Sequence, residues 1–166
     1  MPSINMPKKI LLISVLLLGI IVIIAAQFYI PTLFEAEGYL HIRMAKFMRQ
    51  YGLRYDFHWA RYSVFAKNFA DKDLLYHVLL IPFTFAQDIF RQAKYAACLF
   101  SISLYFILFF ILKRYCLKNL LPWFLLMFFL SPDFLITLSR VRPMVIIFAL
   151  TLVFGHFLIH KNLKGL

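Results

Sequence analysis

The sequence predicts an all-α, polytopic integral membrane protein with four transmembrane helices and amphipathic juxtamembrane helices in a long first outer loop. Hydrophobic residues make up 63% of the chain and charged residues 15%, whereas soluble domains average about 45–50% apolar and about 25% charged residues. Long apolar runs alternate with short basic connections, which is typical of membrane-spanning helices. We expect a single membrane domain over residues 1–166, with spans over about residues 10–29, 95–112, 120–130 and 144–159 and an outer loop over residues 30–94.

The first apolar run, residues 10–29, contains no charged residue. It is long enough to cross a bilayer, since a spanning helix needs about 20 apolar residues. A cleavable signal peptide has a shorter apolar core of about 7–15 residues, followed by small residues at the cleavage site. The stretch IIAAQFYIP does not fit such a site. We therefore predict an uncleaved signal anchor.

The run LLYHVLLIPFTFAQDIF, residues 74–90, is apolar enough to suggest a fifth span. It contains His77, Pro82 and Asp88, and polar or helix-breaking residues are unfavourable in a helix that faces lipid. We therefore predict that this run lies along the membrane surface within the outer loop.

Positive charge in the short connections predicts the orientation of the chain. Seven cations beside the apolar runs lie in segments without an acid: Lys8, Lys9, Lys113, Arg114, Lys118, Lys161 and Lys164. Placing them inside makes both termini cytoplasmic in the plasma (inner) membrane and the 30–94 loop external or periplasmic. Arg140 and Arg142 then face outward, which is contrary to the tendency of cations to lie on the cytoplasmic side. Because topology and one charged loop account for the net charge of +11, we expect no nucleic-acid partner.

The segment after the first span, LFEAEGYLHIRMAKFMRQYGL, has the period of an amphipathic helix. One helical stripe is formed by Leu40, Met44, Phe47, Met48 and Tyr51. Cations lie off this stripe, and Gly52 is a typical C-terminal stop. We expect an interfacial helix over residues 40–51 that lies on the outer leaflet and contacts membrane lipids.

Two glutamates at the entrance of this helix are not explained by a lipid-facing stripe. Glu35 and Glu37 follow the first span closely, at the depth of lipid headgroups. Glu37 and His41 are four residues apart, so on a helix they share one face. The alternative is that the acids only favour the helix dipole and the histidine sits at a wet interface.

The same arrangement recurs downstream in FADKDLLYHVLL. Here Asp71 and Asp73 precede His77, which lies four residues beyond Asp73. Two acid–histidine pairs in one loop could converge on a substrate hydroxyl or on a divalent cation such as Mg²⁺ or Mn²⁺. The candidate metal ligands are Glu37, Asp73 and His77.

The order of features after the first span is an acid, a tyrosine, IRMAKFM, Gly52, Trp59 and LLYHVLLIPF, followed by the second span. This order resembles the N-terminal part of the GT-C superfamily of polytopic glycosyltransferases, which includes aminoarabinose and mannosyl transferases. In that family an acid, in the place of Glu35 or Glu37 here, precedes a tyrosine and an amphipathic helix in the first outer loop. YHVLLIPF takes the place of the family's KPPL or HPPL stretch, without its double proline. LSRVRPMVIIFAL is similar to the start of the family's fourth span, with Arg142 where relatives often have an acid.

The resemblance implies an enzyme that transfers a sugar from a polyprenyl-phosphate donor on the outer face of the membrane. Glu37, or else Glu35, would be the catalytic base that deprotonates the acceptor. Arg140 and Arg142 would neutralise the departing lipid phosphate, although arginines at a helix end also reach for the interface without a substrate. The other substrate-binding residues would be His41, Asp71, Asp73 and His77.

Members of that family have more spans than this chain. We therefore expect the front end of such an enzyme, completed by a missing C-terminal part or by another membrane subunit. The alternative is a non-catalytic integral membrane protein that binds a lipid carrier or a larger membrane partner.

A transporter or channel subunit is less favoured, because such proteins usually carry charges inside their spans. No P-loop, GxSxG or CxxC motif occurs in the sequence, so nothing indicates a nucleotide-driven enzyme or a serine hydrolase.

Overall fold

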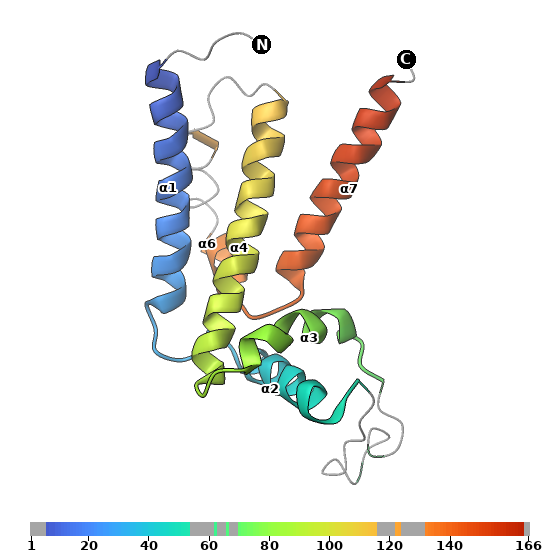
Figure 1. The fold of residues 1–166 in the computed structure, drawn as a ribbon. Helices are drawn as coiled ribbons and strands as arrows, with labels where there is room; N and C mark the ends of the chain where they lie inside the picture. The colour runs from blue at the N-terminus through green and yellow to red at the C-terminus, as the bar shows by residue number, and fades with distance from the viewer. Residues whose placement is uncertain are drawn as a thin grey trace.

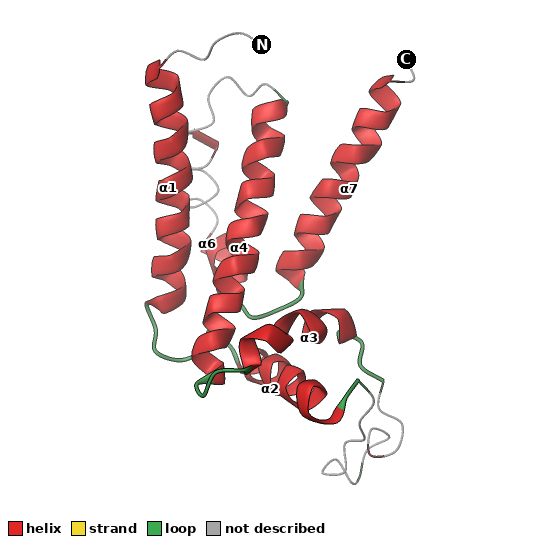
Figure 2. Cartoon of the chain, viewed as in Figure 1, coloured by secondary structure: helices red, strands yellow, loops and turns green. Residues whose placement is uncertain are grey.

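The computed structural model describes residues 6–53, 62, 66, 70–115, 122–123 and 132–164 (Figure 1). Within these ranges the regular elements are helices and no strand occurs, as Figure 2 shows, so the predicted all-helical class is confirmed for this part of the chain. The helices are α1 (Met6–Phe28), α2 (Ala36–Tyr51), α3 (Leu74–Leu80), the 3₁₀ helix η2 (Ile81–Thr84), α4 (Ile89–Arg114), α6 (Pro132–Ser139) and α7 (Met144–Lys164). Trp59 and most of the predicted span over residues 120–130 lie outside the described ranges.

Three long helices stand beside one another, and α2 and α3 gather at one end of them (Figure 1). α4 packs against both α1 and α7, and α6 packs against α1 and α4. α2 and α3 contact each other where α1 finishes and α4 begins; we call this the α2–α3 end. The start of α1 and the end of α7 both lie at the opposite end.

Two helices are long and apolar enough to cross a membrane: α1 over Ile10–Phe28 and α4 over Ile89–Arg114. α6 and α7 pass the same test together, but they are bent by 108° at the turn between them, so they form at most one broken span. The described chain therefore contains two candidate spans, or three with the bent pair, whereas the sequence predicts four. The predicted span over residues 144–159 belongs to the bent pair, within α7.

The helix that contains the predicted span over residues 95–112 begins before that span, at Ile89. α4 starts at Ile89 because Asp88 occupies the N-cap position, where its carboxylate accepts a hydrogen bond of 3.0 Å from the backbone N–H of Arg91. Such a cap satisfies a donor that the first turn of a helix leaves unpaired. The extension places Arg91 and Lys94 in the first turns of a candidate span.

Small residues let the long helices approach one another closely. A Cβ on Gly19 of α1 would lie 2.2 Å from the ring of Tyr105 on α4, so this position has no room for a side chain. The Tyr105 hydroxyl donates a hydrogen bond of 2.8 Å to the carbonyl of Val15. The Ser101 hydroxyl of α4 donates one of 2.6 Å to the carbonyl of Leu138 on α6. Close packing and interhelical hydrogen bonds of this kind are what join helices in lipid.

The predicted helix after the first span is confirmed, and it ends at the predicted glycine. Gly52 has a φ of 89°, which glycine adopts without strain, and its N–H donates a hydrogen bond of 2.9 Å to the carbonyl of Met48. The helix starts at Ala36, one residue after Glu35, so Glu35 takes the N-cap position.

The buried face of α2 overlaps the predicted apolar stripe only at Met44 and Met48. Its buried residues are Gly38, His41, Ile42, Met44, Ala45 and Met48. Leu40 and Tyr51, the two ends of the predicted stripe, are exposed. The face is rotated because α2 packs against α3, η2 and α4, whereas the prediction considered only a lipid surface.

The apolar run after residue 73 forms α3 and η2. At about 1.5 Å per residue in an α-helix and about 2.0 Å in a 3₁₀ helix, the two reach roughly 18 Å, well short of the roughly 30 Å hydrocarbon core. Both elements pack against α2, and η2 also packs against α4. Arg49 strengthens this contact, because its guanidinium donates a hydrogen bond of 2.6 Å to the carbonyl of Thr84 and lies 4.7 Å from the ring of Phe85.

Candidate functional site

Two glutamates at the start of α2 contact two arginines in the turn before α7. Arg142 Nε donates a hydrogen bond to Glu35 Oε1, and Arg142 Nη2 lies 2.9 Å from Glu37 Oε2. Arg140 Nε lies 3.4 Å from Glu35 Oε2, an ion pair without hydrogen-bond geometry. We call these four residues the glutamate–arginine cluster. It joins two segments that are 107 residues apart in the sequence.

Local structure brings the two segments together. Glu35 has an extended backbone at the N-cap position of α2, and its carboxylate makes no capping hydrogen bond, so it is turned to the arginines instead. Val141, between the two arginines, is 1% exposed and packs against Gly38 in the first turn of α2. This apolar contact anchors the turn and holds both guanidinium groups beside the start of α2.

The two glutamates differ in exposure. The side chain of Glu35 is 14% exposed and lies between two guanidinium groups, whereas that of Glu37 is 58% exposed. A carboxylate that is largely removed from water needs a compensating charge, and Arg140 and Arg142 provide it for Glu35. Glu37 contacts Arg142 through one oxygen and stays accessible to a molecule arriving from solvent.

A second group of polar side chains lies between α2 and α3. Asp71 Oδ2 lies 2.5 Å from His77 Nδ1, and His77 Nε2 lies 2.8 Å from His41 Nδ1. The other oxygen of Asp71 accepts a hydrogen bond of 2.9 Å from the backbone N–H of Asp73. We call Asp71, His77 and His41 the histidine chain. Both histidines are buried, and their contact joins the two acid–histidine segments that the sequence predicts to converge.

One arrangement of protons satisfies the contacts of the histidine chain. With Asp71 ionised, His77 donates from Nδ1 and accepts at Nε2 from the N–H of His41. The pKa of His41 is lowered, chiefly by burial and then by the neighbouring His77 and Arg142, whereas Asp73 and Glu37 act in the opposite direction. His41 therefore favours its neutral form.

The spacing of Glu37 and His41 does not produce a hydrogen-bonded pair. Glu37 binds Arg142, and His41 binds His77 instead. The reason is tertiary packing. α3 places the imidazole of His77 against the buried face of α2, and the turn before α7 places the guanidinium of Arg142 against the first turn of α2.

The second predicted pair is also changed. Asp73 occupies the N-cap position of α3, where its carbonyl accepts the backbone N–H of His77 at 3.0 Å. The His77 side chain reaches back to Asp71, because side chains on a helix lean toward its N-terminus. The partner of His77 is thus the acid six residues before it, not four.

The predicted metal ligands Glu37, Asp73 and His77 are not assembled in the described structure, where no group of three or more histidine, cysteine or acidic residues could hold a metal ion. In the observed arrangement both ring nitrogens of His77 are occupied by Asp71 and His41.

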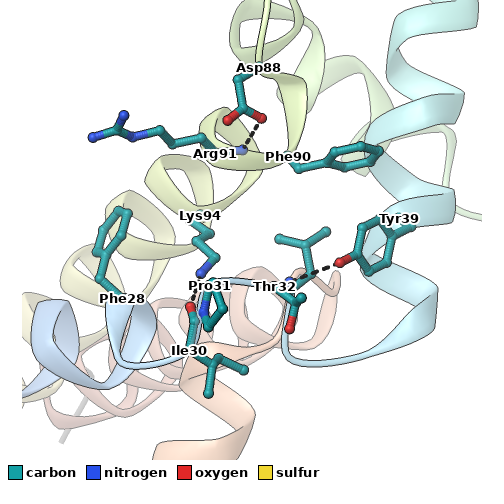
Figure 3. A pocket seen from close by; sticks show the side chains of 10 residues that line it. Phe28, Ile30, Pro31, Thr32, Tyr39, Asp88, Phe90, Arg91 and Lys94 are labelled. Carbon is teal, nitrogen blue, oxygen red and sulfur yellow. Dashed lines mark hydrogen bonds between the residues drawn. The ribbon is translucent and has the colours of Figure 1, made fainter.

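A pocket of about 420 Å³ lies at the α2–α3 end, between the loop after α1 and the first turns of α4 (Figure 3). Its lining residues are Phe28, Ile30, Pro31, Thr32, Leu33, Tyr39, Asp88, Phe90, Arg91 and Lys94. Lys94 reaches across it and donates a hydrogen bond to the carbonyl of Ile30. The Tyr39 hydroxyl accepts one of 3.2 Å from the backbone N–H of Leu33.

Sequence reasoning missed Arg91 and Lys94, which it counted only among the mixed charges of the outer loop. The available signal was their position three and six residues after Asp88, a good N-cap residue, and just before an apolar run.

In the part of the chain that the structure describes, these features are helices, with two candidate membrane spans or three if the bent pair is one, together with two polar clusters and a pocket at the α2–α3 end. Comparison of the sequence and structure with models of protein families, with curated proteins and with solved structures finds no match.

Proposed function

We propose that this chain is a GT-C-like membrane glycosyltransferase, or the N-terminal part of one, which transfers a sugar from a polyprenyl-phosphate donor on the outer face of the membrane. The observation that supports this most is the contact of Glu37, in the first turn of α2, with Arg142. A base for the acceptor and a cation for the departing phosphate must both lie within reach of one sugar, and this contact places a carboxylate and a guanidinium side by side.

Glu37 is the better candidate for the base because its side chain is 58% exposed, whereas that of Glu35 is 14% exposed and held by two arginines. In the proposed reaction, Glu37 takes the proton of the acceptor hydroxyl while the acceptor oxygen attacks the anomeric carbon. The bond between that carbon and the phosphate oxygen breaks, and the lipid phosphate leaves with the electron pair. Arg140 and Arg142 stabilise the negative charge that develops on it.

The histidine chain joins α2, which carries Glu37, to α3. We propose that His41, Asp71, Asp73 and His77 form the wall opposite Glu37. A divalent cation, Mg²⁺ or Mn²⁺, is the other means of neutralising the phosphate, and Glu37, Asp73 and His77 would have to rearrange to hold it. Transfer that survives removal of divalent cations by a chelator would assign this task to the arginines.

The test is transfer of a labelled sugar from a polyprenyl-phosphate donor in membranes that contain the chain, with and without a co-expressed membrane partner. Glu37→Gln should abolish donor-dependent transfer while leaving membrane insertion intact. Asp133→Asn is the matched control, since it removes an exposed acid of α6 outside the cluster, and it should retain transfer. Donor binding without transfer, in every combination, would favour a non-catalytic protein that binds a lipid carrier. Full transfer by the Glu37→Gln variant would eliminate Glu37 as the base.

A further inference from the structure

Lys94 is the one buried lysine or arginine among the side chains that the structure describes; it is 4% exposed. Its amino group donates a hydrogen bond to the carbonyl of Ile30 and lies 5.6 Å from the centre of the Phe28 ring. Both contacts favour a cation, but neither partner is an anion, and no carboxylate of the described chain forms an ion pair with Lys94. A buried charge without a compensating charge is strongly unfavourable. An anion bound beside Lys94 would supply that compensation.

The glutamate–arginine cluster does not present the same situation. Its arginines already face carboxylates, Glu35 and Glu37. None of its four residues lines the pocket that Lys94 borders. Lys94 and the pocket therefore form a site of their own.

The pocket suits an anion that is attached to an apolar group. Arg91 adds a second positive charge from an exposed position on its lining, and the Thr32 hydroxyl can donate a hydrogen bond. Asp88 is the acid on the lining; its carboxylate accepts the backbone N–H of Arg91 as the N-cap of α4, and the two cations of the lining outnumber its single negative charge. Phe28 and Phe90 supply apolar walls, and the volume of about 420 Å³ falls within the roughly 300–1,000 Å³ that is usual for small-molecule sites.

The place of the pocket in the fold agrees with this chemistry. It lies where α1 ends at Phe28 and α4 begins at Ile89, and both helices are candidate membrane spans. The ends of spanning helices lie at the level of lipid headgroups, where phosphate groups are the abundant anions.

We propose that this pocket binds a phosphate group, with Lys94 as the buried cation that contacts it and Arg91 as a second cation at its edge. The apolar walls and the headgroup level favour a phosphate carried on a lipid; a free phosphate ion would use the same contacts. Phosphate binding in this pocket does not require sugar transfer, so the result of its test is independent of the test of the proposed function.

The experiment measures ligand binding by the full chain purified in detergent, using thermal unfolding and native mass spectrometry. The probes are phosphatidic acid, phosphatidylcholine with the same acyl chains, and inorganic phosphate. The unmodified chain should bind phosphatidic acid on the order of tenfold more tightly than phosphatidylcholine, as expected from a charge-assisted hydrogen bond, and bound lipid should raise its melting temperature. Lys94→Met should remove this preference, since methionine keeps an unbranched side chain, one heavy atom shorter, and removes the charge.

The matched control is Lys113→Met, which removes an exposed lysine at the other end of α4 and should keep the full preference. Arg91→Gln, an exposed change that does not threaten folding, should weaken binding of phosphatidic acid about threefold, as for a partly solvated charge pair. It serves as the second test if Lys94→Met does not fold.

Inorganic phosphate separates the two sources of the group. If it displaces phosphatidic acid or stabilises the chain alone, the pocket recognises phosphate without a lipid; if it does neither while phosphatidic acid binds, the occupant is a lipid headgroup. Both outcomes support the site. Equal binding of the two lipids by the unmodified chain, together with no effect of inorganic phosphate, would overturn it. Unchanged binding in both the Lys94→Met and Arg91→Gln variants would do the same.

Discussion

Arg142 Nη2 lies 2.9 Å from Glu37 Oε2, and the same guanidinium group donates a hydrogen bond to Glu35 through Nε. One arginine therefore bridges both acids at the start of α2 and ties them to the turn before α7. Because the side chain of Glu35 is 14% exposed and that of Arg142 is 31% exposed, this bridge lies partly out of water. Interactions of this kind are more sensitive to the loss of one partner than exposed ion pairs are.

Arg142→Gln should lower the free energy of unfolding by about 1–3 kcal/mol, because Glu35 would stay largely buried without its hydrogen-bonded cation. Chemical unfolding of the purified chain in detergent, followed by circular dichroism, measures the change. Asp133→Asn should change it by less than about 0.5 kcal/mol, as for an exposed residue. Equal unfolding midpoints for the two variants would contradict a stabilising role of the cluster.

Gly19→Ala should destabilise the packing of α1 on α4 by about 1–3 kcal/mol, the usual effect of overpacking, since its Cβ would lie 2.2 Å from the Tyr105 ring. Gly155→Ala is the control: no atom lies within 4 Å of its Cβ position, and alanine should stabilise α7 by up to about 1 kcal/mol. Thermal unfolding in the same detergent compares them. If the two substitutions act alike, α1 and α4 do not meet at Gly19.

His41 should make the contact of α2 with α3 sensitive to acid. Its pKa in the folded chain is lowered from 6.5, so between that lowered pKa and 6.5 the unfolded chain binds more protons. Stability is therefore complete above pH 6.5 and is lost as the pH falls through this window, by at most about 1.4 kcal/mol per pH unit. The protection factors of the α2 amides, which correct for the pH dependence of intrinsic hydrogen exchange, should fall over the same range.

Two variants separate His41 from other titrating groups. His41→Gln should flatten the pH dependence of the protection factors in α2, whereas His156→Gln should leave it unchanged, because His156 contacts Tyr115 near the end of α4. A pH dependence that persists in the His41→Gln variant would assign the effect to another residue.

The predicted topology can be tested with single cysteines at Asn119 and Asn162 after replacement of Cys98 and Cys116. The basic segments around both asparagines predict a cytoplasmic location. An impermeant thiol reagent added from outside should then label neither position in intact cells, but should label both after the membrane is opened. Labelling of both from outside would reverse the orientation and place the glutamate–arginine cluster inside.

The sequence by itself determined the helical class, the two candidate spans and the helix after the first span. These features depend on local composition and period: an uncharged run in residues 10–29, a second over residues 95–112, and a helical pattern that stops at Gly52. Local patterns of this kind do not require knowledge of a partner. The same reasoning predicted a span over residues 95–112 but not that its helix extends back to Ile89, because the capping by Asp88 was not considered.

Only the tertiary structure decided which polar groups meet. Helical spacing predicts the pairs Glu37–His41 and Asp73–His77, but the structure pairs Glu37 with Arg142 and His77 with His41 and Asp71. A side chain binds the strongest partner that packing brings to it, and those partners come from other segments, 107 residues away for the arginine that binds Glu35. Burial likewise distinguishes Lys94 from the other cations. In the sequence it is one of many positive charges, but in the structure the packing of α4 against the loop after α1 buries it without an anionic partner.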